Sequence, residues 1–175
     1  HAAGKVTGTG WTGGLLGTND ECTLSNCYAT GNVSGSNETG GFAGWNYRSS
    51  ISNSFSTGDV SSAGGNYTGG FAGTSTLAGT LVNCYATGNV TVSGTTTLVG
   101  SLVGYTASAT ITGCYAVGAV SFSGDDKGGI TADDWESTYN SCFYDTETTG
   151  MSATNADFGT PATTAQMKTQ ATFTG

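Results

Sequence analysis

A short glycine-rich motif recurs five times along this chain of 175 residues. Its copies begin at residues 13, 40, 69, 100 and 128, so successive copies lie 27 to 31 residues apart. A period of this size indicates a solenoid, a propeller or a repeat array. A propeller blade needs roughly 40 residues for its four strands, so the period excludes a propeller. The five copies read GGLLG, GGFAG, GGFAG, GSLVG and GGITA.

A second motif follows the first at nearly the same period. Its copies read NCYATG, NSFSTG, NCYATG, GCYAVG and SCFY, beginning at residues 26, 53, 83, 113 and 141. Side chains alternate as in a β-strand, because Cys27, Ala29 and Val33 can share one face while Tyr28 and Thr30 take the other. We therefore predict an all-β fold, a right-handed parallel β-solenoid (β-helix). It has about five coils of 27–31 residues, each with about three strands, and no helix before residue 160.

Equivalent residues of successive coils would stack in columns, and three apolar columns are predicted to face the core. One coil cannot bury its apolar face alone, so the neighbouring coils must supply the contact area that stabilises the chain. The columns are Leu15, Phe42, Phe71, Leu102 and Ile130; Leu24, Ile51, Leu81 and Ile111; and Val33, Val60, Val90 and Val120.

An asparagine column lies just before the second motif's cysteines. We predict that Asn26, Asn53 and Asn83 form a ladder of amide hydrogen bonds that satisfies a buried bend. Gly113 and Ser141 replace asparagine in the last two coils, which predicts a looser stack there.

Four of the five cysteines occupy one predicted inward column, with Ser54 at their place in the second coil. Reduced thiols in the core are the favoured interpretation, and disulfides between neighbouring coils remain an alternative. The column is Cys27, Cys84, Cys114 and Cys142, while Cys22 lies outside it and could close a small loop to Cys27 in an oxidising compartment.

The outward column of the second motif is aromatic and is the strongest candidate for ligand binding. It comprises Tyr28, Phe55, Tyr85, Tyr115 and Phe143. Mutual stacking that stabilises the solenoid is the favoured interpretation, and a platform for sugar rings is the alternative. A threonine column, Thr30, Thr57 and Thr87, resembles part of an ice-binding array.

Charge and residue types exclude several classes of function. The net charge of −8 would repel nucleic acid, and no apolar run is long enough for membrane insertion. The single histidine, His1, and the absence of a Cys-x-x-Cys pair argue against a zinc site or a Ser-His-Asp triad. We predict no catalytic residue, metal or cofactor. An acidic segment is interpreted as a solvated turn, with calcium binding left open, and contains Asp125, Asp126, Asp133, Asp134 and Glu136.

The two motifs together resemble a known repeat. Gly-Gly-Phe-Ala-Gly followed by Asn-Cys-Tyr-Ala-Thr-Gly-Asn-Val is similar to the GLUG motif of bacterial surface proteins, over residues 13 to about 145. The resemblance implies a place in a large secreted or wall-attached protein, such as an adhesin or the non-catalytic region of an immunoglobulin A peptidase. Residues 145–173 resemble the segment that follows the last repeat.

The expected organisation is one domain, with solenoid repeats at 1–145 and a C-terminal cap at 146–175 that includes a short helix at residues 163–169. The expected function is a non-enzymatic structural or adhesive module, extracellular or at the cell surface. Its partners would be other domains of a larger surface protein and host or environmental glycans. One alternative is a filament subunit that binds copies of itself, and another is a glycan- or ice-binding solenoid.

Overall fold

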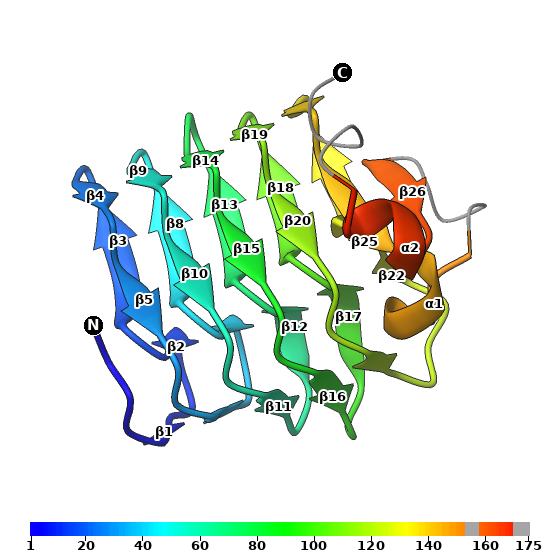
Figure 1. The fold of residues 1–175 in the computed structure, drawn as a ribbon. Helices are drawn as coiled ribbons and strands as arrows, with labels where there is room; N and C mark the ends of the chain where they lie inside the picture. The colour runs from blue at the N-terminus through cyan, green and yellow to red at the C-terminus, as the bar shows by residue number, and fades with distance from the viewer. Residues whose placement is uncertain (153–157, 170–175) are drawn as a thin grey trace.

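The chain folds into a parallel β-solenoid of about five turns, as the repeats predict (Figure 1). The computed structural model describes residues 1–152 and 158–169. Each turn contributes one short strand to each of five parallel sheets, which we label A to E. The expectation of about three strands per coil was therefore wrong, because each coil has more corners than the glycines indicate.

Each sheet is built from one strand per coil, in register. Following the chain through the first coil, the order of the sheets is B, C, D, E and A. Sheet B contains β1 (Val6–Thr7), β6 (Val33–Gly35), β11 (Val60–Ser62), β16 (Val90–Val92) and β21 (Val120–Ser121). Sheet C contains β2 (Thr12–Gly13), β7 (Thr39–Gly40), β12 (Gly65–Gly69), β17 (Thr96–Gly100) and β22 (Lys127–Gly128).

The other three sheets follow the same rule. Sheet D contains β3 (Leu16–Asp20), β8 (Ala43–Tyr47), β13 (Ala72–Thr76), β18 (Val103–Ala107) and β23 (Thr131–Trp135). Sheet E contains β4 (Thr23–Ser25), β9 (Ser50–Ser52), β14 (Thr80–Val82), β19 (Thr110–Thr112) and β24 (Thr138–Asn140). Sheet A contains β5 (Tyr28–Ala29), β10 (Phe55–Ser56), β15 (Tyr85–Ala86), β20 (Tyr115–Ala116), β25 (Phe143–Asp145) and β26 (Thr160–Ala162).

The glycine-rich motif forms the corner between sheets C and D. A Cβ atom added to Gly40 would lie 2.1 Å from the carbonyl oxygen of Ala43, and one added to Gly41 would lie 2.2 Å from that of Gly70. A Cβ atom on Gly44 would lie 2.5 Å from the backbone nitrogen of Thr12. The glycines are therefore required by close approach of the backbone, which only a residue without a side chain allows.

Two further corners use left-handed backbone. The residues at the corner between sheets D and E are Glu21, Arg48, Leu77, Ser108 and Glu136, with φ between 47° and 54°. Those at the corner between sheets E and A are Asn26, Asn53, Asn83, Gly113 and Ser141, with φ between 48° and 63°. This conformation costs an ordinary residue about 1–2 kcal/mol, and asparagine and glycine tolerate it best.

The second corner corrects the interpretation of the asparagine column. Asn26, Asn53 and Asn83 are exposed, so they do not satisfy a buried bend. One side-chain hydrogen bond does link two of them: Nδ2 of Asn83 donates to Oδ1 of Asn53 at 3.2 Å. The column is explained by its left-handed backbone, which is also why Gly113 can stand in the same place.

The three predicted apolar columns form the core. Strand pairing aligns Leu24, Ile51, Leu81 and Ile111, and it aligns Val33, Val60, Val90 and Val120. In the remaining column the rings of Phe42 and Phe71 stack with centroids 4.7 Å apart, and Leu15 at its start is only half-buried. Val6 and Tyr139 extend two of the columns by one residue each.

The segment after the fifth coil contains two short helices. α2 (Thr164–Met167) lies within the predicted helix, and Thr163 caps it by accepting a bond from the Gln166 backbone, whose side chain bonds back to Thr163. α1 (Thr146–Thr149) was not expected, because it is too short to show an apolar period. Its signals are the capping side chain of Asp145 and the left-handed Gly150.

The described residues of this segment lie against the end of the core. β26 pairs with β25 and adds a sixth strand to sheet A (Figure 1). The ring of Phe158 lies 5.5 Å from that of Tyr139, and a Cβ atom on Gly159 would meet the Ile130 side chain. Two core columns thus end against this segment. The described residues include no helix of the length and apolarity that a membrane span requires.

Candidate functional site

The predicted aromatic column forms a continuous ladder along sheet A, which we call the sheet A ladder. Ring centroids lie 5.1 Å apart for Tyr28 and Phe55, 4.9 Å for Phe55 and Tyr85, and 4.9 Å for Tyr85 and Tyr115. His1 stacks on Tyr28 at 4.9 Å, and Phe143 is the strand partner of Tyr115.

Stacking leaves little room for a ligand on the sheet A ladder. Neighbouring ring planes differ by only 4° to 7° from Tyr28 to Tyr115, so each inner ring has both faces covered. A sugar would need one of those faces. Burial raises the pKa of Tyr115, and the charge interaction with the neighbouring Tyr85 raises it to a smaller extent. The geometry therefore favours mutual stacking, and sugar binding here stays a prediction.

The threonine column beside this ladder is only partly regular. Thr30 and Thr57 are exposed, Thr87 is partly buried, and Val117 follows them in the fourth coil. An array of this kind provides no uninterrupted row of hydroxyl groups, so ice binding also stays a prediction.

The cysteine column lies where predicted, and it does more than fill space. Cys84, Cys114 and Cys142 are buried, whereas Cys27 is half-buried. Each thiol donates to the carbonyl two residues earlier, at 3.3–3.5 Å. Sγ of Cys114 also accepts the backbone N–H of Cys84 at 3.4 Å.

Ser54 shows what this position requires. Its hydroxyl donates to the carbonyl of Ser52 at 2.7 Å and accepts the backbone N–H of Cys27 at 3.1 Å. Serine and cysteine are interchangeable here because both groups donate and accept across the left-handed corner. All five cysteines, exposed Cys22 included, are free thiols. Hydrogen bonds with Cys142 and Cys84, together with burial, raise the pKa of Cys114.

Two polar ladders were not predicted from the sequence. Asn19 donates to Asn46 at 2.9 Å, and Asn46 donates to Ser75 at 3.2 Å, in a buried row on sheet D. In a second, exposed row, Asn32 accepts the backbone N–H of Asp59, and Asp59 accepts that of Asn89, at 3.0 and 2.9 Å. The 27-residue interval from Asn19 to Asn46 and from Asn32 to Asp59 was a signal for both.

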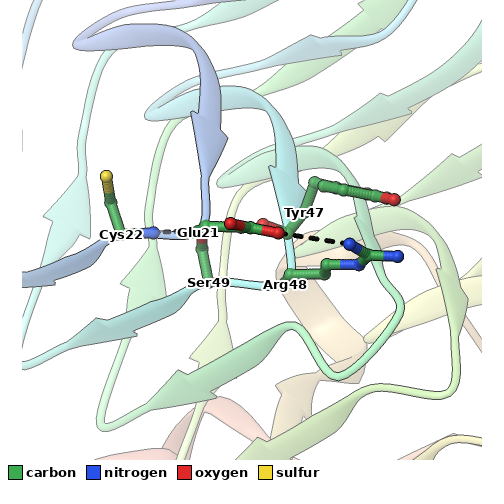
Figure 2. A network of polar contacts seen from close by, with 5 residues as sticks. All are labelled: Glu21, Cys22, Tyr47, Arg48 and Ser49. Carbon is green, nitrogen blue, oxygen red and sulfur yellow. Dashed lines mark hydrogen bonds and ion pairs between the residues drawn. The ribbon is translucent and has the colours of Figure 1, made fainter.

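A small polar network ties the first two coils together at the corner between sheets D and E. The guanidinium of Arg48 lies 3.1 Å from Oε1 of Glu21, and the backbone N–H of Cys22 donates to the hydroxyl of Ser49 at 2.9 Å. Figure 2 shows these residues together. Arg48 also lies over the ring of Tyr47, at 5.0 Å. The hydrogen bond with Glu21 raises the pKa of Arg48. Both partners are exposed, so the pair contributes little to stability.

The acidic segment behaves as a set of local turns. Oδ1 of Asp133 accepts the backbone N–H of Asp134, and Oδ2 of Asp134 accepts that of Ser137, both at 2.8 Å. Asp125, Asp126 and Glu136 are exposed. Within residues 1–152 and 158–169, no three carboxylate, histidine or cysteine side chains gather as metal ligands.

A second aromatic feature, which is concave, lies between sheets C and D. We call it the aromatic groove, and its volume is about 180 Å³. Its lining residues are Trp11, Glu38, Trp45, Tyr67, Thr74, Thr76 and Tyr105. Trp11 and Trp45 lie 5.1 Å apart by ring centroid, and Tyr67 and Tyr105 lie 5.0 Å apart.

Register explains how the groove is assembled. Trp11, Glu38 and Tyr67 each stand two residues before a glycine-rich motif, in one column of sheet C. Trp45, Thr74 and Tyr105 each stand just after a motif, in one column of sheet D. The tight glycine corner brings the two columns face to face. The groove is not predicted from the sequence, because neither column repeats one residue type.

Glu38 is the one charged residue among the described residues that line the groove. Its Oε2 atom is buried and has no hydrogen-bond partner there. The indole N–H of Trp45 already donates to the hydroxyl of Thr76 at 2.8 Å.

The architecture defines a solenoid of stacked β-repeats, and comparison with known families specifies the repeat. The model of the GLUG motif matches residues 8–34, 35–61 and 64–91, so the chain contains three GLUG repeats. The same five-sheet pattern continues beyond residue 91. Comparison with curated proteins and with solved structures finds no significant match.

Proposed function

We propose that this chain is a non-catalytic structural and adhesive repeat module of a bacterial cell-surface protein, acting outside the cell. One observation carries the proposal: all five sheets run in register from the first coil to the fifth. Such a stack is held by contacts between adjacent coils and behaves as a stiff rod, which suits a spacer between other domains. The GLUG repeats support the same assignment.

The surface suits an exposed position in solution. Charged residues form only 9% of the chain, and outward positions are mainly serine, threonine and asparagine. The five coils would span about 24 Å at the usual strand spacing. Surfaces of other molecules, including glycans, would meet the sides of this rod.

An adhesion assay tests the proposal. Beads coated with the purified chain should be retained on glycan-bearing surfaces under flow more than beads coated with an unrelated β-solenoid. Equal retention would contradict the adhesive part. A Tyr85→Ala, Tyr115→Ala variant locates the contact: lower retention assigns it to the sheet A ladder, and unchanged retention with a lower melting temperature assigns that ladder to stability alone.

A filament subunit is the second candidate, and the strand edges favour it. Sheets B to E end at β1–β4 on one side of the described stack and at β21–β24 on the other, and exposed edges can pair between copies. Electron microscopy and sedimentation of the purified chain separate the candidates. Monomers support a spacer module, whereas fibres that lengthen with concentration support the filament.

A further inference from the structure

We propose that the aromatic groove binds a quaternary ammonium group. This inference is independent of the proposed structural function. It rests on three features of the groove: a buried carboxylate oxygen without a hydrogen-bond partner, several aromatic rings, and a single charged acceptor among the described lining residues.

The carboxylate of Glu38 supplies the charge. Its Oε2 atom is buried without a donor, and the described lining residues include no lysine or arginine. A carboxylate oxygen removed from water without a partner is costly, and a nearby cation lowers that cost. The net charge of the chain, −8, adds a negative electrostatic potential to that of the carboxylate, and both attract a cation.

The rings supply the surface on which such a cation is held. Trp11 is 52% exposed, so its indole is accessible, and it tilts by 39° against Trp45. Tyr67 and Tyr105 form a stacked pair farther along the groove. A cation over an aromatic face is attracted by the negative face of the ring, most strongly over tryptophan.

The donors and acceptors of the groove bear on the type of cation. The indole N–H of Trp45 is engaged by Thr76, so the buried Oε2 of Glu38 is the one charged acceptor that the described lining residues offer. A primary ammonium or a sugar carries several donors, and one carboxylate oxygen cannot replace all of their hydrogen bonds to water. A quaternary ammonium has no N–H to satisfy, so it loses least on entering the groove.

The experiment compares two molecules of the same shape and different charge. Choline and its neutral analogue 3,3-dimethyl-1-butanol are titrated into the full chain, followed by tryptophan fluorescence and calorimetry. We expect choline to bind and the neutral analogue to bind at least about fivefold more weakly, because the carboxylate and rings act on the charge. Ethanolamine and glucose, tested in the same way, should also bind more weakly than choline.

Two variants assign the binding to the groove. Glu38→Gln keeps the size of the side chain and should weaken choline binding about fivefold or more. Glu136→Gln removes a charge from an exposed corner outside the groove and should leave binding unchanged. Circular dichroism verifies that both variants are folded. Equal affinity for the two isosteres, stronger binding of glucose or ethanolamine, or full binding by folded Glu38→Gln would each overturn the proposal.

Discussion

At the scale of single residues, backbone conformation explains the sequence better than side-chain contacts do. Ser141 occupies a left-handed corner where other coils place asparagine or glycine, and Ser108 occupies the left-handed corner between sheets D and E, where no coil places either. Each serine pays a conformational cost that glycine avoids. These positions are therefore poorly optimised for stability.

Replacing Ser108 by glycine should stabilise the protein by about 0.5–1 kcal/mol, because relief of the left-handed strain exceeds the entropy that glycine adds to the unfolded chain. Urea unfolding measures the change. The control is Ser121→Gly, at an exposed strand position, which should destabilise the protein instead. A loss of stability in both variants would contradict the strain argument.

Tyr139 gives the stability a dependence on alkaline pH. Burial raises its pKa well above the usual value, so the folded state favours the protonated phenol. The resulting stabilisation is complete below about pH 10, the value for unfolded tyrosine, and is lost as the pH rises through that value toward the folded pKa. The free energy of unfolding should fall as the pH rises above about 10, and less steeply in Tyr139→Phe. If the free energy of unfolding depends on pH equally in the original protein and in Tyr139→Phe, Tyr139 does not cause the loss of stability.

At the scale of elements, the corners and the columns work together. At three left-handed corners the backbone N–H of the following residue points to the next coil, and a small hydroxyl or thiol accepts it at 2.9–3.4 Å, as Ser49, Ser54 and Cys114 do. The cysteine column is therefore a set of hydrogen-bonding positions as well as part of the core.

Cys114→Ser should be tolerated better than Cys114→Val. Serine retains both hydrogen bonds, as Ser54 does in the second coil, whereas valine leaves the Cys84 N–H without an acceptor at a cost of about 1–3 kcal/mol. Thermal unfolding of the two variants measures the difference. A more stable valine variant would indicate that packing dominates at this position.

At the scale of the whole molecule, the two ends differ. The described residues after the fifth coil lie against Ile130, Tyr139 and β25, while sheets B to E begin at β1–β4. Each coil is stabilised by contacts with the coils on either side. Whether further coils or copies can add to the stack therefore depends on whether its end strands are covered.

Deleting residues 146–175 should promote self-association. The deletion uncovers the fully buried Tyr144 and the last members of the core columns, creating an apolar surface next to strand edges. Light scattering across a concentration series measures the mass, with the full chain as control. A truncated protein that stays monomeric and folded would argue against a capping role for this segment.

The sequence by itself determined the repeat, the parallel stack and the three core columns, because those depend on a period and on alternation along each strand. It also revealed the helix at residues 164–167 and the aromatic ladder of Tyr28, Phe55, Tyr85 and Tyr115. Only the tertiary structure decided how many corners each coil has, because left-handed φ values at residues such as Arg48 and Glu21 have no reliable residue signature. It alone brought Trp11, Glu38 and Trp45 into one groove, since these positions meet through a glycine corner that stacks different residue types from successive coils.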